Sequence, residues 1–379
     1  MRILKKRGLV ALLLLVAVTL AGCMGGGVTN PGWTVVTVQD EVVYAALSTG
    51  QVVALDAAKG GAALWSYPPA SQSSGPACAI ARRSPDSASP LDAVYGAPVV
   101  ADDLLLVTSF DRRLYAFDRH TGAKQWDFTA EDSIIGGVTL VDGVAFFGSA
   151  DHRVYAVDLA TQKLIWEAPF ATGNRVWGAP AVDEARVYVG SMDHYVYALD
   201  RQTGREIWRH DLGCSIPGSV TLADGMLFVG GVDKRLHVLK AEDGSELWKT
   251  EELDGWVWGE ALVEDGYVYF GTLGGHVYGL RVTDGAPRWQ PVALEGAVRA
   301  GPVTQGQNLI VGTDAGRLYS IHKETGERDM VYDQISGGIF SRPAVVGDRL
   351  FVGTASGRVY ALDVTRRDPL LWVYPPSSK

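Results

Sequence analysis

The stretch LYAFDRHTGAKQW, Leu114–Trp126, recurs in varied form along the chain of 379 residues. Related copies end at Trp65, Trp166, Trp208, Trp248, Trp289, Met330 and Trp372. The steps between consecutive ends, with Trp126 included, are 61, 40, 42, 40, 41, 41 and 42 residues. A unit that recurs at a nearly constant spacing indicates repeated architecture before it indicates chemistry.

Each repeat contains four short strand-like segments. In the fourth copy these are WGAPAV (177–182), RVYVGS (186–191), YVYALD (195–200) and REIWRH (205–210). The segments are rich in Val, Tyr and Ile, and Gly and Asp turns separate them. A period near 40 residues with this content is typical of a β-propeller. We predict an all-β, eight-bladed β-propeller of four-stranded antiparallel blades over residues 33–376, with residues 66–93 inserted as a loop between blades 1 and 2.

The recurring residues have a structural interpretation. Asp118, at the end of a third strand, can accept hydrogen bonds from the amides of the Thr-Gly turn after it, and Gly122 supplies the positive φ of that turn. The Trp on each fourth strand offers an apolar face and an N–H to the next blade. The residues predicted to lie between blades are Trp65, Trp126, Trp166, Trp208, Trp248, Trp289 and Trp372.

The N-terminus resembles a lipoprotein export signal. Basic residues between Arg2 and Arg7 precede the apolar run 9–20, which is too short to span a membrane. The LAGC tetrapeptide that ends at Cys23 resembles a bacterial lipoprotein cleavage box. We expect residues 1–22 to be the signal peptide, Cys23 to be lipidated, and residues 23–32 to form a tether. The folded part is then extracytoplasmic and lipid-anchored, in the periplasm or at the outer surface of the cell membrane.

The repeat pattern Ala-x-Asp-x-x-Thr-Gly-x-x-x-Trp resembles that of the quinoprotein-type (PQQ-like) propellers. With the lipoprotein signal, the chain is similar to the BamB family, the propeller lipoproteins of the outer-membrane β-barrel assembly machinery. The resemblance implies a non-catalytic protein-binding scaffold, with a role in outer-membrane protein assembly. Its expected partner is another extracytoplasmic or membrane protein, and we expect the chain itself to be a monomer.

An enzyme is the first alternative. By resemblance, a PQQ-dependent quinoprotein oxidoreductase needs an adjacent cysteine pair, a calcium site and a catalytic Asp, and this sequence has no adjacent cysteines. It also has no phosphate-binding loop, CxxC, HExxH or GxSxG motif. The Asp-His pairs at 151–152 and 193–194 are more readily explained as solvated turns than as metal ligands. We therefore expect no catalytic residues, no metal ligands and no cofactor, neither PQQ nor calcium.

Charge excludes a further class of partner. The chain has a formal net charge of −9, and removal of the four basic signal residues leaves the mature part near −13. An exported domain with this charge is a poor ligand for nucleic acid.

One propeller face is predicted to hold the site. The residues that precede the small residue of each first strand include Tyr95, Trp177, Trp258, Arg299 and Phe340. The residues that begin the third strands form a mostly basic set: Arg113, Arg153, Arg235, Arg317 and Arg358. Both sets fit a binding face for a peptide or small ligand, and a small-ligand sensor or carrier is the second alternative. Packing between inner strands and arginine stems that cover neighbouring tyrosines remain open as structural explanations.

Two cysteines besides Cys23 fall on the same face. The twelve residues between Trp65 and Cys78 could span about 40 Å, enough to bring Cys78 to Cys214 across the propeller. A disulfide would fix the inserted loop over the channel, and spacing alone leaves open whether the two cysteines pair.

Overall fold

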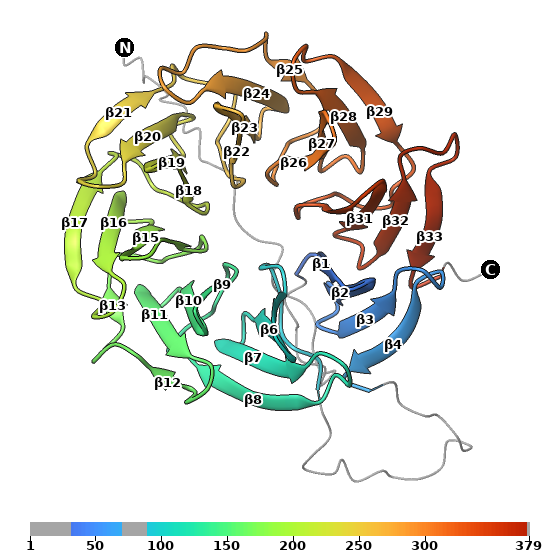
Figure 1. The fold of residues 1–379 in the computed structure, drawn as a ribbon, viewed down its shortest axis with the longest axis horizontal. Helices are drawn as coiled ribbons and strands as arrows, with labels where there is room; N and C mark the ends of the chain where they lie inside the picture. The colour runs from blue at the N-terminus through green and yellow to red at the C-terminus, as the bar shows by residue number, and fades with distance from the viewer. Residues whose placement is uncertain (1–31, 70–88, 377–379) are drawn as a thin grey trace, which may run out of the picture.

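The computed structural model describes residues 32–69 and 89–376, and all regular structure in these ranges is β-strand. The strands form eight antiparallel sheets, arranged as blades around a central axis (Figure 1). This confirms the predicted eight-bladed β-propeller. None of the residues described forms a helix that is long and apolar enough to cross a membrane.

The blades follow one another in chain order. Blade 1 consists of β1 (Val35–Gln39), β2 (Val42–Ala46), β3 (Val52–Asp56) and β4 (Ala62–Tyr67), and blade 2 of β5 (Val99–Ala101), β6 (Leu104–Thr108), β7 (Arg113–Asp118) and β8 (Lys124–Thr129). Blade 3 consists of β9 (Thr139–Val141), β10 (Val144–Gly148), β11 (Arg153–Asp158), β12 (Lys163–Leu164) and β13 (Phe170–Ala171). Blade 4 consists of β14 (Ala181–Val182), β15 (Arg186–Gly190), β16 (Tyr195–Asp200) and β17 (Glu206–Asp211). Blade 5 consists of β18 (Thr221–Ala223), β19 (Met226–Gly230), β20 (Leu236–Lys240) and β21 (Glu246–Lys249), and blade 6 of β22 (Leu262–Glu264), β23 (Tyr267–Gly271), β24 (His276–Arg281) and β25 (Val292–Ala293). Blade 7 consists of β26 (Val303–Gln305), β27 (Asn308–Gly312), β28 (Leu318–His322) and β29 (Arg328–Tyr332). Blade 8 consists of β30 (Ala344–Val346), β31 (Arg349–Gly353), β32 (Val359–Asp363) and β33 (Leu370–Tyr374).

Two outer strands are interrupted, and proline explains both interruptions. In blade 3 the outer edge is split into β12 and β13, which both pair with β11, and Pro169 lies between them. In blade 6 the outer edge keeps β25 and an isolated bridge between Leu280 and Pro287. Proline has no N–H to donate to a ladder, so it is tolerated at these edge positions at the cost of strand length.

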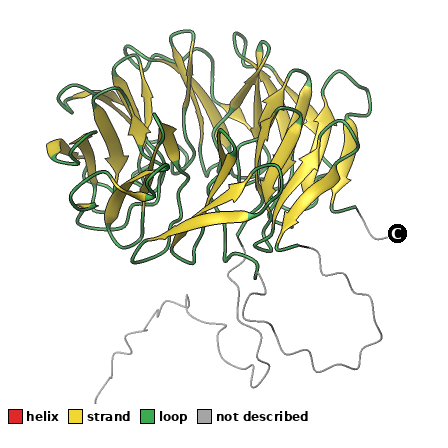
Figure 2. Ribbon diagram, turned by 60° about the horizontal axis from the view of Figure 1, so that its bottom comes forward, coloured by secondary structure: helices red, strands yellow, loops and turns green. Residues whose placement is uncertain are grey.

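The first strand of each blade lies nearest the axis and the fourth lies at the rim (Figure 1). Seen from the side, the strands run between two faces made of turns and loops (Figure 2). One face carries the connections between blades and the hairpins between second and third strands. In blade 3 these are residues 130–138 and 149–152, and the Glu131 N–H donates to Asp151 Oδ2 at 2.9 Å between them. We call this the top face.

The ring closes without a shared strand. β1–β4 form one sheet and β30–β33 another, so blades 1 and 8 are each complete, as predicted. The Thr34 N–H donates to the Thr354 carbonyl at 3.1 Å, and Ser341 Oγ donates to the Thr34 carbonyl at 2.9 Å. An apolar cluster that includes Val43, Leu55 and Phe351 fills the junction. Closure therefore depends on packing and on hydrogen bonds between two whole blades.

The recurring Trp residues lie at the junctions between blades. Their indole N–H groups donate to backbone carbonyls of the next blade in six cases, at 2.8–3.3 Å: Trp65, Trp166, Trp208, Trp248, Trp289 and Trp372. Trp126 packs into the apolar cluster shared by blades 2 and 3. Each of the six hydrogen-bonded rings also covers a turn glycine of the next blade, as Trp166 covers Gly204. In blade 7 the position holds Met330, which is exposed.

The Asp residues of the repeat organise the turns at the opposite face. Asp118 Oδ1 accepts the Thr121 N–H at 2.8 Å and its hydroxyl at 2.9 Å, and Asp158 and Asp200 bond their own turns in the same way. The threonine hydroxyl and amide lower the pKa of each carboxyl. The turns of Asp118 and Asp200 hold Gly122 and Gly204 against the rings of Trp65 and Trp166, so the repeat motif acts as the joint between blades.

Candidate functional site

A cavity of about 520 Å³ runs along the propeller axis, and its lining comes from the first strands and the residues just before them. The residues that directly precede the small residue of each first strand form one ring at the top face, with one residue from each blade. In blade order the ring is Trp33, Tyr95, Ile135, Trp177, Pro217, Trp258, Arg299 and Phe340. The structure therefore brings together all five residues that the sequence assigned to the channel mouth.

Trp33 completes the ring, and the sequence interpretation missed it. Trp33 contacts Tyr95 with ring centroids 4.6 Å apart, and it contacts Phe340 at 5.7 Å, both edge to face. The signal was present, because Trp33 directly precedes Thr34, the blade 1 counterpart of the small residue that begins each first strand. Blade 1 has no preceding repeat, which made that register hard to assign.

The other side of the ring combines aromatic and cationic groups. Trp177 and Trp258 belong to blades 4 and 6, and their centroids lie 6.3 Å apart. The Arg299 guanidinium lies over the Phe340 ring at 5.1 Å from the centroid. Aromatic rings and an arginine at a concave mouth are the residue types that anchor peptides and planar ligands.

Two of the residues that line the cavity carry a buried donor without a hydrogen-bond partner among the residues described. Trp177 Nε1 and Arg299 Nε are buried atoms without a hydrogen-bond acceptor among the residues described. A buried donor without an acceptor costs free energy, so such atoms commonly mark a place that a ligand or water satisfies. Deeper in the cavity, Arg342 pairs with Glu260 at 3.1 Å and donates from Nε to the Pro302 carbonyl at 3.1 Å. That pair leaves Arg299 as the cation at the mouth.

The layer below the ring is built from small residues, mostly glycine, because the blades approach closely there. A Cβ on Gly178 would lie 2.1 Å from the Gly218 carbonyl oxygen, and one on Gly218 would lie 2.3 Å from the Trp258 carbonyl oxygen. Small residues therefore allow neighbouring first strands to touch, and the bulkier ring residues are placed directly above that contact.

The basic set lies elsewhere on the top face and does not line the cavity. Arg113 pairs with Asp127 at 3.2 Å, and Arg317 pairs with Glu295 at 2.9 Å. Arg153 pairs with Glu131, and Arg235 donates to the Thr250 carbonyl at 2.5 Å with Glu251 nearby at 3.8 Å. Asp127 lies on the fourth strand of the same blade and Glu251 in the connection after it, whereas Glu131 and Glu295 lie in the connections that precede the blades of Arg153 and Arg317. These four guanidinium groups are thus partly neutralised, and Arg358 also has an interaction partner.

One exposed aromatic residue adds to the top face. Trp256 lies two residues before Trp258 and is 41% exposed. Its carbonyl accepts the Leu273 N–H at 2.9 Å, which fixes the connection to the adjacent hairpin. The sequence assignment did not include Trp256, because the equivalent position in the other blades is not aromatic.

The remaining predicted residues divide between two groups. Cys23 and Cys78 lie outside the described residues, as do the signal and most of the tether. Cys214 is buried and forms no disulfide within the part of the chain that the structure describes. The sequence left open whether it pairs with Cys78, and Cys78 lies outside the described residues.

The comparisons with known proteins agree with this geometry. The family model described as outer membrane protein assembly factor BamB matches residues 19–192 and 192–379. The chain belongs to the BamB family. A comparison with curated proteins finds no match.

Two solved structures show the same fold as this BamB-family chain. The computationally designed Ika8 protein has a TM-score of 0.73 at 15% identity, over 88% of this chain and 96% of its own. BamB from Moraxella catarrhalis has a TM-score of 0.61 at 20% identity, over 73% of this chain and 87% of its own. At these identities the likeness concerns the fold. The family match confirms the PQQ-like propeller similar to BamB that the repeat indicated.

Proposed function

We propose that this chain is a non-catalytic, membrane-anchored scaffold of the extracytoplasmic space that binds a protein partner in outer-membrane protein assembly. The observation that carries the proposal is the circle of mostly aromatic residues around the cavity mouth, together with the exposed Trp256 on the same face. Membership of a family described by outer-membrane protein assembly supports the choice of partner. Exposed Trp beside an aromatic pocket is typical of the anchor residues of protein interfaces.

The arrangement supports peptide recognition more than recognition by charge. Arg113, Arg153, Arg235 and Arg317 each have a carboxylate partner, so they offer little net attraction to an anionic surface. The ring and Trp256 instead offer apolar area at low conformational cost. We expect a partner segment with an apolar or aromatic side chain that enters the mouth.

Crosslinking in native membranes tests the proposal. A photo-crosslinking residue near position 256, followed by pull-down, should recover a protein of the β-barrel assembly machinery. Trp256→Ala and Trp258→Ala should reduce that recovery several-fold. Ile207→Ala is the matched control, because Ile207 is 45% exposed but lies at the rim on β17. Equal recovery from all three variants would place the interface away from the top face.

The non-catalytic part of the proposal has its own test. By family resemblance, a quinoprotein enzyme should reduce an electron-acceptor dye once PQQ and calcium are added. We expect no dye reduction and no rise in melting temperature with this chain. Turnover with an alcohol or sugar substrate would show that the chain is an enzyme and would contradict the proposal of a non-catalytic scaffold.

A small-ligand carrier is the second candidate, and the two unpartnered donors favour it. Trp177 and Arg299 both line the cavity, and their buried Nε1–H and Nε–H groups lack the acceptor that a carboxylate or carbonyl oxygen would supply. A thermal-shift screen with small carboxylates should then find a ligand whose effect disappears in Arg299→Leu. A screen without such a ligand leaves the scaffold as the sole proposal.

A further inference from the structure

Blade 5 departs from its neighbours at one buried position. In blades 2, 3 and 4 a tyrosine of the third strand donates its hydroxyl to the Asp of the preceding hairpin, at 2.6–2.7 Å: Tyr115 to Asp111, Tyr155 to Asp151 and Tyr197 to Asp193. In blade 5 the equivalent residues are His237 and Asp233. His237 Nε2 lies 3.0 Å from Asp233 Oδ2, so the acidic partner is kept while the tyrosine is replaced by a metal-binding residue type.

Two further changes accompany this histidine. The hairpin serine of blades 2 to 4 is replaced by Gly231, and Cys214 stands where blade 3 has Asp132. A Cβ on Gly231 would lie 2.5 Å from Cys214 Sγ and 2.3 Å from Asp233 Oδ1. The absence of a side chain at 231 therefore makes room for the thiol beside the carboxylate. In blade 3, Ser149 Oγ uses the corresponding space to donate to the Asp132 carbonyl at 3.0 Å.

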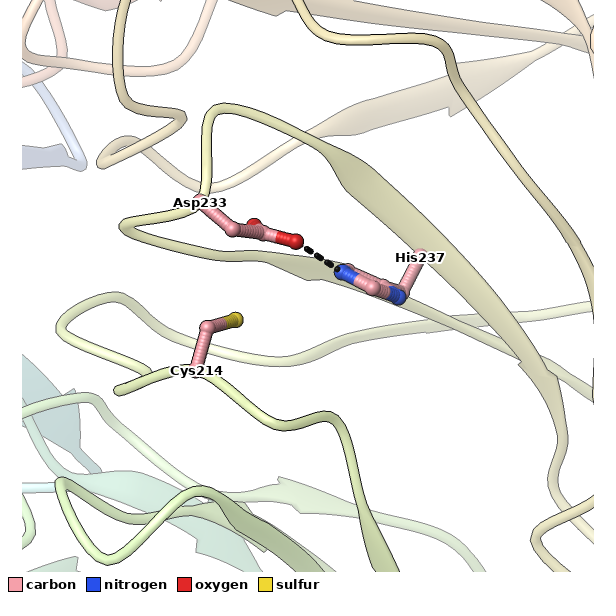
Figure 3. A group of neighbouring side chains, drawn as sticks. All are labelled: Cys214, Asp233 and His237. Atoms are coloured by element: carbon pink, nitrogen blue, oxygen red, sulfur yellow. Dashed lines mark hydrogen bonds and ion pairs between the residues drawn. The ribbon is translucent and has the colours of Figure 1, made fainter.

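The three side chains converge from three segments of the chain. Cys214 comes from the connection before β18, Asp233 from the hairpin between β19 and β20, and His237 from β20 (Figure 3). Sγ of Cys214, a carboxylate oxygen of Asp233 and a ring nitrogen of His237 lie within 4.8 Å of one another. His237 is 1% exposed and Cys214 is 7% exposed, so water competes little for the position between them.

Glu246 orients the histidine from the other side. His237 Nδ1 lies 3.1 Å from Glu246 Oε2, so the ring stands between two carboxylates. A neutral imidazole has one N–H, which can satisfy one carboxylate but not both. A proton on Nδ1 toward Glu246 leaves the Nε2 lone pair directed to Asp233 and Cys214. Carboxylate–histidine–metal arrangements in proteins have this form.

We propose that Cys214, Asp233 and His237 form a binding site for a divalent transition-metal ion of the Zn²⁺ type. A thiolate, an imidazole and a carboxylate are the donors that Zn²⁺ takes in tetrahedral sites, and three protein ligands leave a fourth position for water or a partner's side chain. Binding breaks the S–H bond of Cys214, forms an S–metal bond and releases the proton to solvent.

The thiol is otherwise inert at this position. Burial, with the negative charge of Asp233, raises the pKa of Cys214 to about 12. The carboxylate of Asp233 beside Sγ favours a cation at this position, and it is the convergence of the three donor atoms within 4.8 Å of one another that points to a metal ion.

Cobalt binding tests the proposal. The full chain with Cys23→Ser and Cys78→Ser keeps Cys214 as its single thiol, since the sequence has three cysteines. Titration with Co²⁺ should saturate at one equivalent and give the near-ultraviolet charge-transfer band of a Co²⁺–thiolate bond. Added Zn²⁺ should abolish the band. Adding Cys214→Ser should remove the band, and His237→Tyr should weaken Co²⁺ binding at least tenfold.

A variant built from the protein's own repeat controls for misfolding. The triple substitution Cys214→Asp, Gly231→Ser and His237→Tyr gives blade 5 the residues of blade 3, Asp132, Ser149 and Tyr155, which already pack in this fold. This variant should fold, and added Co²⁺ should produce no thiolate charge-transfer band. Saturation of the parent chain without a thiolate band, or no saturable binding at all, would overturn the proposal.

The orienting role of Glu246 has a matched comparison. Glu246→Gln should weaken Co²⁺ binding about 10- to 100-fold, as loss of such a partner does in known metal sites. Glu206 stands at the same position of blade 4, so Glu206→Gln should leave Co²⁺ affinity unchanged. Equal effects of the two substitutions on Co²⁺ affinity would show that Glu246 does not orient His237 for metal binding.

Discussion

The indole N–H of Trp166 donates to the carbonyl oxygen of Arg201 in the next blade at 2.9 Å, while its ring covers Gly204. Trp166 is 3% exposed, which makes it the most fully buried of the recurring Trp residues. One side chain thus supplies apolar area, a hydrogen bond and a surface for the neighbouring turn. The blade junction is the unit on which stability depends.

Trp166→Ala should lower the free energy of unfolding by about 3–5 kcal/mol, because a large buried side chain leaves a cavity. Denaturant unfolding at neutral pH measures this. Arg153→Ala in the same blade should leave the unfolding free energy nearly unchanged, since its ion pair with Glu131 is exposed to solvent. Small and equal losses would show that the Trp residues do not hold the blades together.

Gly204→Ala should be more destabilising than Gly143→Ala, and the comparison separates backbone strain from packing. The two residues have φ of +71° and +74°, so alanine costs about 1–2 kcal/mol at either position. A Cβ at 204 would also lie 2.5 Å from the Trp166 ring, whereas one at 143 would meet nothing within 4 Å. We expect an additional loss of about 1–3 kcal/mol at 204. Equal losses at the two positions would show that the contact between Gly204 and the Trp166 ring does not contribute to the stability of the blade junction.

The repeat allowed the blade number, the closure and the channel ring to be predicted, because each follows from spacing alone. Position within a repeat determines whether a residue faces the axis, as Tyr95 and Trp258 do. Trp33 was not assigned to the channel ring because no repeat precedes blade 1 to set the register of its first strand. The acidic partners of Arg113 and Arg317 could not be predicted from the sequence for another reason. Asp127 and Glu295 come from a fourth strand and from a connection of irregular length, so their contacts depend on backbone details that the repeat does not encode.

The Cys214, Asp233 and His237 cluster shows the same limit more sharply. The sequence interpretation assigned no metal ligands, since the three residues lie in different segments and match no spacing motif. Cys214 and His237 each depart from the repeat at their own positions, whereas Asp233 is the Asp that blades 2 to 4 also have, and the three side chains come together only in three dimensions. Alignment of the blades would have marked His237 among tyrosines, but it would not have shown that Gly231 makes room for the thiol.

Acid should destabilise the propeller through its turn carboxylates. Hydrogen bonds from Thr121, Thr161 and Thr203 hold the pKa of Asp118, Asp158 and Asp200 below the ordinary value of 3.8. Because the folded-state pKa is depressed, their stabilisation is complete above the unfolded pKa and is lost as pH falls through the folded pKa. Stability should therefore decline below about pH 4.

The triple variant Asp118→Asn, Asp158→Asn and Asp200→Asn tests this, since asparagine keeps an acceptor oxygen without the charge. It should be less stable than the parent chain at pH 7, and the difference should shrink as the pH approaches 3. Urea unfolding at several pH values measures both chains. A difference that stays constant with pH would show that the three carboxylates do not contribute through ionisation.

Cys214 should carry a free thiol that reacts only when the protein unfolds. It is buried, and its pKa of about 12 leaves on the order of a thousandfold less thiolate at neutral pH than an ordinary cysteine has. Alkylation of Cys214 should therefore be slow in the native protein and rapid in denaturant, with peptide mapping under non-reducing conditions to locate the label. Zn²⁺ should slow the native reaction further if the thiol is a ligand, and this protection should be absent in His237→Tyr. Recovery of a linked Cys78–Cys214 peptide would establish the disulfide instead and remove the sulfur ligand from the proposed metal site.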